Sequence, residues 1–133
     1  KTTVNEGKVT MRFYEYETWK LKEGVNIEEY DQMLRDWFQF LHDHKEELFQ
    51  EWISAKYYKE TDIEGVPSGR YIMVFEYESL DGHHAYKKRR NYKGPYAPYK
   101  LVDPYYHYFN YDETTCTYWQ PIEPERWLDT DKK

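Results

Sequence analysis

The chain has 133 residues and a formal net charge of −6, and aromatic residues make up 20% of it within a hydrophobic total of 39%. Rings that each bury about 150–250 Å² supply a core for one domain, so the scarcity of aliphatic residues does not indicate disorder. The acidic balance argues against nucleic-acid binding, the single Cys116 excludes a disulfide framework and a cysteine-based zinc site, and no apolar run reaches the roughly 18 residues of a membrane span.

The first half of the chain is expected to form a strand and then a long helix. Residues 9–21 are rich in β-branched and aromatic types, with apolar residues at alternate positions, which predicts a strand. Asn26 and Glu29 have the spacing of a capping box, and apolar residues recur at helical spacing from there to about Phe49. We therefore expect a helix to begin just after Asn26.

The second half is expected to contain three strands and one helix. Residues 51–59 and 70–79 read as strands, and the Gly- and Pro-containing segment 65–69 joins them as a hairpin. A helix is predicted over 82–93, where a Gly-Pro pair ends it, and a last strand over 114–119.

This order predicts an α+β, ferredoxin-like βαββαβ fold, with a four-stranded antiparallel sheet and two helices on one face. The third strand contains five consecutive apolar residues, 71–75, so both of its faces need burial. A second copy of the chain is expected on the face that the helices leave open, giving a homodimer. We expect one domain over 9–122 with a Tyr-rich insert at 94–111, a flexible segment 1–8 before it and a tail 123–133 after it.

Three stretches carry a family resemblance. The turn Leu21 to Gly24 before the capped helix, and the run Tyr77 to Tyr86 with its paired histidines, resemble the dimeric α+β-barrel superfamily, which includes antibiotic-biosynthesis-monooxygenase-like, EthD-like and NIPSNAP-like proteins. Residues 117–122 are similar to the last strand and proline-containing tail of these proteins. The resemblance implies two sheets packed face to face in a homodimer, with each ligand cleft between a subunit's own sheet and helices. Members include cofactor-free oxygenases, haem enzymes and isomerases, so the fold does not choose a reaction.

The candidate catalytic residues are His83, His84 and Arg90. Both histidines would lie in the first turn of the second helix, where the helix dipole disfavours imidazolium and keeps a ring neutral as a base. The alternative is that one histidine is solvated and the other packs, because adjacent helical residues diverge by about 100°. Arg90 lies seven residues after His83, on the same helical face, where it could bind a carboxylate or enolate oxygen. The cationic run 87–90 either clamps an anion or only complements the helix dipole.

Aromatic side chains are candidates to line a pocket for a planar ligand, and each of them could instead belong to the core. These ligand-binding candidates are Tyr14, Trp37, Trp52, Tyr86, Tyr96 and Tyr99. Glu15 and Glu17 alternate on one face of the first strand, and we assign them to an edge or a cleft rim rather than to a catalytic pair. The insert 94–111 would either cover the cleft or extend the dimer contact.

Three functional hypotheses follow. The first is a homodimer that binds a small planar or apolar molecule, as a cofactor-independent oxygenase or isomerase with His83 or His84 as base and Arg90 or a Tyr hydroxyl stabilising an oxyanion. The second is a non-catalytic structural or interaction dimer. The third is a haem-binding protein with His84 or His107 as axial ligand. We expect no metal site or cofactor, no membrane or nucleic-acid partner and a cytoplasmic location.

Overall fold

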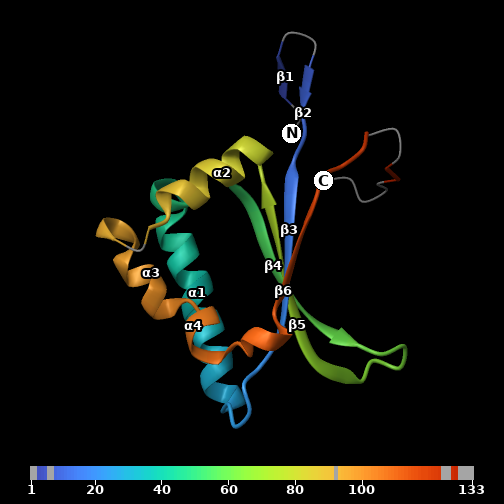
Figure 1. Ribbon diagram of the computed structural model, residues 1–133, viewed down its shortest axis with the longest axis vertical. Helices are drawn as coiled ribbons and strands as arrows, with labels where there is room; N and C mark the ends of the chain where they lie inside the picture. Colours follow the sequence, from blue (N-terminus) through green and yellow to red (C-terminus); the bar gives the residue numbers. More distant parts are fainter. Residues whose placement is uncertain (1–2, 6–7, 92, 124–126, 129–133) are drawn as a thin grey trace.

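The computed structural model describes residues 3–5, 8–91, 93–123 and 127–128. Helices lie on one side of a twisted sheet, and a short hairpin projects beyond the end of that sheet (Figure 1). The elements in chain order are β1 (Thr3–Asn5), β2 (Lys8–Thr10), β3 (Phe13–Lys20), α1 (Ile27–Leu48), β4 (Trp52–Thr61), β5 (Pro67–Tyr77), α2 (Leu80–Arg89), η1 (Gly94–Tyr96), α3 (Ala97–Val102), α4 (Tyr105–Tyr108), η2 (Tyr111–Glu113) and β6 (Thr115–Trp119).

The main sheet is antiparallel throughout and has the strand order β4-β5-β3-β6. The central strands, β3 and β5, are the first and third strands of this sheet in chain order, as in a ferredoxin-like fold. The predicted fold class is therefore confirmed. Alternation along β3 turns Phe13 and Trp19 toward the helices, where both are buried, and turns the exposed Tyr16 toward the opposite, open face. The two faces of one strand therefore meet different environments.

The long helix α1 begins where the capping spacing predicts. The side chain of Asn26 accepts a hydrogen bond from the Glu29 backbone N–H at 3.1 Å, which satisfies one of the free donors at the helix start. The buried side chains of α1 recur at helical spacing and face the sheet. They are Tyr30, Leu34, Trp37, Leu41 and Leu48.

The structure differs from the predicted elements in two places. The predicted strand 9–21 is divided, because β2 pairs with β1 in a separate two-stranded sheet and β3 begins only at Phe13. The predicted helix 82–93 ends at Arg89, after which the backbone of Arg90 is extended. The division of the chain into segment 1–8, domain 9–122 and tail 123–133 stays a prediction.

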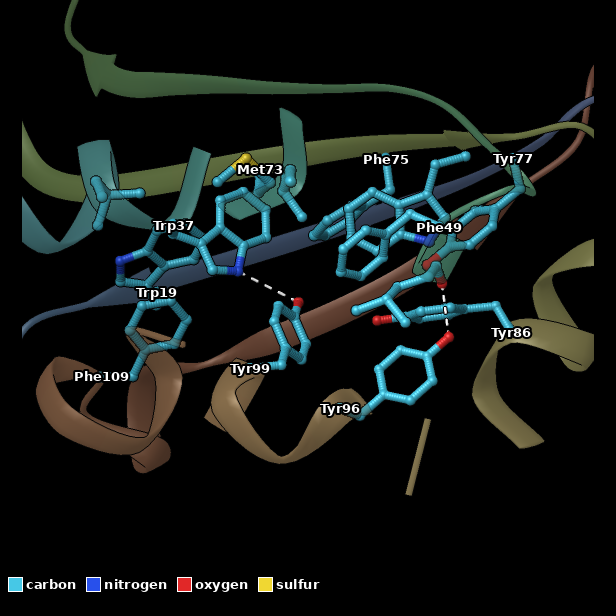
Figure 2. Packing of buried hydrophobic residues seen from close by; sticks show 14 of the residues in the cluster. Trp19, Trp37, Phe49, Met73, Phe75, Tyr77, Tyr86, Tyr96, Tyr99 and Phe109 are labelled. Atoms are coloured by element: carbon cyan, nitrogen blue, oxygen red, sulfur yellow. Dashed lines mark hydrogen bonds between the residues drawn. The ribbon is translucent and has the colours of Figure 1, made fainter. Parts of the chain in front are cut away.

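The core consists largely of aromatic rings, as the composition predicts. The indole of Trp19 stacks on Phe109 at 4.1 Å between ring centroids and donates a hydrogen bond to the Tyr30 hydroxyl at 3.0 Å. Figure 2 shows the insert packing on this core, with the Tyr99 hydroxyl accepting from Trp37 Nε1 at 3.2 Å. The insert 94–111 thus folds into short helices on the helix side of the sheet.

None of the helices in the described ranges has both the length and the apolar character that crossing a membrane requires.

Candidate functional site

A cavity of about 430 Å³ lies between the sheet and the helices. This volume is within the range of small-molecule sites. Side chains from both layers and from the insert line the cavity. They are Glu15, Glu17, Trp37, Trp52, Phe75, Tyr77, Tyr86, Lys87, Arg90, Tyr99, Asp103, Tyr105, Tyr106, Thr114, Thr115, Cys116 and Tyr118.

The two sides of the cavity differ in chemistry because of the strand order. Trp52 of β4 and Phe75 of β5 pack with Trp37 of α1, with ring centroids 5.0 Å apart between Trp52 and Phe75 and 6.2 Å between Trp37 and Phe75. Across the sheet, the neighbouring strand β3 brings the carboxyl groups of Glu15 and Glu17 to the cavity. A ligand in this space would meet aromatic walls on one side and acids on the other.

Glu15 is held as an anion. One carboxylate oxygen, Oε1, lies 3.4 Å from Nε2 of His83 and accepts a hydrogen bond from the Tyr77 hydroxyl at 3.4 Å. The other, Oε2, accepts from the Cys116 thiol at 3.2 Å and lies 4.0 Å from Nζ of Lys87. Burial by itself raises the pKa of Glu15, but the contact with His83 and the charge of Lys87 outweigh it and hold the pKa below its usual value.

Glu17 is different, although it lies only two residues further along the same face. Among the residues that the structure describes, its carboxyl group makes no hydrogen bond and no ion pair. Burial, together with the negative charges of Glu15 and Asp103, raises the pKa of Glu17 to about 7, against the lowering effect of Lys87 and Arg90. A carboxyl group with this pKa can take up and release a proton near neutral pH.

Two cations and one more acid also line the cavity. Lys87 and Arg90 come from α2 and its end, and the guanidinium carbon of Arg90 lies 5.5 Å from the Tyr86 ring centroid. Asp103 follows α3, where its carboxylate accepts the Tyr105 backbone N–H at 3.0 Å, and burial raises its pKa. Nε1 of Trp52 is buried and has no hydrogen-bond partner among the described residues, so a donor remains available.

The structure brings five of the predicted site residues to this cavity. They are Arg90, Trp37, Trp52, Tyr86 and Tyr99. His83 is buried, but it lies behind Glu15 against Phe13 and Tyr77, at centroid distances of 4.9 and 4.8 Å, and does not line the cavity. Its position makes it a partner of Glu15 rather than a group that meets a ligand.

Three predicted site residues lie elsewhere. Tyr14 is on the open face of the sheet, where its hydroxyl donates to Glu76 at 3.3 Å, because alternation along β3 turns it away from Glu15. His84 is exposed and does not line the cavity. Tyr96 is buried as an anchor, with its hydroxyl donating to the Leu48 carbonyl at 2.6 Å and accepting from Arg89 Nε at 2.9 Å.

The haem hypothesis finds no axial ligand at this cavity. His84 and His107 are both exposed, and no described histidine borders the cavity. Within the described ranges, no group of three or more His, Cys, Asp or Glu side chains is arranged to hold a metal ion.

Sequence reasoning assigned Glu15 and Glu17 to an edge or a rim, whereas the structure places both inside the cavity. The sequence contained a signal for this placement. Phe13 and Trp19 lie an even number of residues from the two glutamates along β3, so all four side chains point to the same face of the sheet, and Phe and Trp are typical core residues. The residues of the cationic run 87–90 also have different surroundings in the structure. Arg89 clamps Glu51 through two contacts of 2.8 and 2.7 Å, while Lys87 and Arg90 reach the cavity.

No protein-family model matches the sequence, and a search of curated proteins finds no similar sequence. Solved structures do share the fold. A dimeric ferredoxin-like protein from an uncultured marine organism has a TM-score of 0.57 at 10% identity, over 85% of this chain and 97% of its own. A dimeric protein of unknown function from Bacteroides fragilis has a TM-score of 0.54 at 10% identity, over 82% and 95%.

A third similar structure is a variant of SnoaB, a cofactor-independent oxygenase from Streptomyces nogalater. It has a TM-score of 0.50 at 8% identity, over 90% of this chain and 98% of its own. At such identities the likeness shows the fold alone. It confirms the resemblance to the dimeric α+β barrels at the level of the fold.

Proposed function

We propose that this protein is a homodimer that binds a small planar molecule between its sheet and helices, and that Glu17 moves a proton to and from a carbon of that molecule. The observation that carries the proposal is the carboxyl group of Glu17, unpaired among the described residues, in an aromatic-walled cavity of about 430 Å³. A stable core does not require such a group, whereas proton transfer does.

The proton step can be written with the side chains present. The Glu17 carboxylate takes a proton from a carbon next to a ligand carbonyl, the electron pair of that C–H bond forms a C=C bond to the carbonyl carbon, and the π pair of the C=O bond moves to the oxygen. The positive charge of Arg90, which borders the same cavity, stabilises the resulting enolate oxygen. Return of the proton to another carbon completes an isomerisation, and an oxygenase would use the same enolate with dioxygen as co-reactant.

This assignment moves the role of base from the histidines to Glu17. His84 is exposed and His83 lies behind Glu15, so neither ring meets a ligand in the cavity. The pKa of Glu17, raised by burial to about 7, gives similar amounts of its two protonation states near neutral pH. Proton uptake and return are then both available without a cofactor.

The open face of the sheet supports self-association. Tyr16, Tyr58 and Trp119 lie on this face with 36%, 52% and 58% of their surface exposed, and Ile72 and Val74 lie between them half-buried. Apolar surface of this extent is typical of an interface. Two of the similar structures are described as dimeric, which agrees with a second copy as the partner.

The test uses β-tetralone, a neutral ketone with a planar aromatic ring and readily enolised hydrogens next to its carbonyl. Incubation with the protein in deuterium oxide should replace the hydrogens next to the carbonyl faster than buffer alone, as measured by proton NMR. Glu17→Gln should slow this exchange by about 100-fold, the typical contribution of a general base. Glu76→Gln is the matched control, because Glu76 lies on the open face, and it should leave the rate unchanged.

A second measurement locates the ligand. Cys116→Trp places an indole in the cavity and should abolish β-tetralone binding in calorimetry, whereas Leu101→Trp adds the same group at a position that is 70% exposed and should not. Exchange no faster than in buffer would remove the catalytic proposal and leave a dimer with a binding cavity. Equal rates in the wild type and Glu17→Gln would show that Glu17 is not the base.

A further inference from the structure

Groups from three different elements hold the carboxylate of Glu15. Tyr77 of β5 and His83 of α2 approach Oε1, each at 3.4 Å, while the Cys116 thiol of β6 reaches Oε2 at 3.2 Å. The side chain is almost fully buried, with the residue 5% exposed. A carboxylate with donors on both oxygens has neither the freedom nor the open position to exchange protons with a ligand. Glu15 therefore serves another purpose than Glu17.

The spacing of the two glutamates makes them electrostatic neighbours. Residues two apart on a strand face the same side, with Cα atoms about 7 Å apart. Because the two carboxyl groups are close together and partly removed from water, a fixed negative charge on Glu15 opposes ionisation of Glu17. Lys87, whose Nζ lies 4.0 Å from Glu15 Oε2, acts on both carboxyl groups with the opposite sign.

We propose that the ionised Glu15, clamped by Tyr77, His83 and Cys116, is a positioning residue whose fixed charge acts on Glu17 in addition to burial, and that Lys87 opposes this effect. This inference rests on the proposed function of Glu17 as the proton-transferring group. It assigns His83 an indirect role, because His83 supports the ionised form of Glu15 and does not meet the ligand.

Other charged and titratable groups line the same cavity as Glu17. They are Glu15 of β3, Tyr77 of β5, Tyr86, Lys87 and Arg90 of α2 and its end, Tyr99 and Asp103 of α3 and its end, Tyr105 and Tyr106 of α4, and Cys116 and Tyr118 of β6. Asp103 is the other acid in this set. Burial raises its own pKa, whereas the pKa of Glu15 is held below its usual value. Both acids oppose the ionisation of Glu17, and Glu15 contributes the larger effect of the two.

The experiment measures the titration of Glu17 directly, by carbon NMR of labelled glutamate carboxyl groups, with Glu17→Gln identifying the signal. Glu15→Gln keeps an oxygen that can accept from Tyr77 and lie beside His83 but loses the charge, so the Glu17 midpoint should move to lower pH by about one unit. Lys87→Met should move it upward. Lys88→Met is the matched control, since Lys88 is exposed beside Lys87 and does not line the cavity, and it should leave the midpoint in place.

The pH profile of β-tetralone exchange gives an independent readout, and its midpoint should follow the NMR midpoint in each variant. An unmoved NMR midpoint in Glu15→Gln overturns the inference, and so does a loss of exchange at all pH values without such a shift. If Glu15→Gln does not fold, the test is the NMR midpoint of Glu17 in Lys87→Met. An upward shift of this midpoint supports the inference, and no shift overturns it. A shifted NMR midpoint in protein that catalyses no exchange supports the electrostatic link and counts against the proposed function alone.

Discussion

Both faces of the sheet carry carboxyl groups, but the carboxyl groups on the two faces differ in their hydrogen-bond partners. On the open face, Glu76 accepts hydrogen bonds from Arg12 at 2.6 Å, Tyr14 at 3.3 Å and Ser54 at 3.2 Å. On the helix face, Glu17 has no comparable partner among the described residues, although it borders a cavity. A carboxylate whose oxygens are already occupied serves packing and register, while one left unpaired beside a cavity is available to a ligand.

The faces also differ in how their aromatic side chains are used. Trp19 on the helix face is 1% exposed and is fixed by Phe109 and Tyr30, whereas Tyr16 on the open face of the same strand is 36% exposed. One face is completed within the subunit. The other presents apolar surface that a second copy would cover, as we propose.

The largest expected effect is a difference in the loss of stability between substitutions on the two faces of β3. Trp19→Ala should lower the free energy of unfolding by about 3–5 kcal/mol, because it removes a fully buried indole and the hydrogen bond that this indole donates to the Tyr30 hydroxyl. Tyr16→Ala, on the same strand, should cost about 1 kcal/mol at concentrations where the chain is monomeric. Urea unfolding followed by circular dichroism measures both, and equal losses would contradict the division between the faces.

The next effect concerns association through the open face. Tyr58→Glu places a charge at a position that is 52% exposed on β4, and it should weaken self-association by about 100-fold, since a charge buried between two sheets is poorly solvated. Light scattering should then give the monomer mass of 16.6 kDa at concentrations where the wild type gives twice that mass. As a control, Leu101→Glu on α3 should stay dimeric. A wild type that is already monomeric would refute the proposed interface.

The smallest effect is a pH dependence of stability. The pKa of Glu17 is raised to about 7 in the folded protein, so the folded state binds a proton that the unfolded state has released. Stability should therefore fall as pH rises from about 4.5 through 7, and Glu17→Gln should remove about 1–3 kcal/mol of this loss at alkaline pH while changing little in acid. Thermal unfolding across this range tests the prediction. A variant with the same slope as the wild type would show that Glu17 is not the titrating group.

Much of the fold was predictable from local patterns. The strand and helix order, the cap at Asn26 and the apolar stripe of α1 all depend on residues close together in the chain, and the structure agrees with them. Trp37 and Trp52, which were candidates both for the core and for a ligand site, are buried and also line the cavity, and their binding of a ligand stays a prediction. The predictions that differ from the structure concern residues whose surroundings are set by segments distant in the chain. Tyr14 was assigned to the cleft because nothing local distinguishes it from Glu15 until the sheet acquires a covered face.

By itself, the sequence determined the fold class and the aromatic core, because propensity, capping and hydrophobic periodicity act over a few residues. Only the tertiary structure decided which carboxyl groups are paired. Glu15 obtains its partners from residues up to 101 positions away, and Glu17 obtains none among the described residues. The proton affinity of a carboxyl group depends on burial and on charges across space, and these exist only once β3, β6 and α2 lie together.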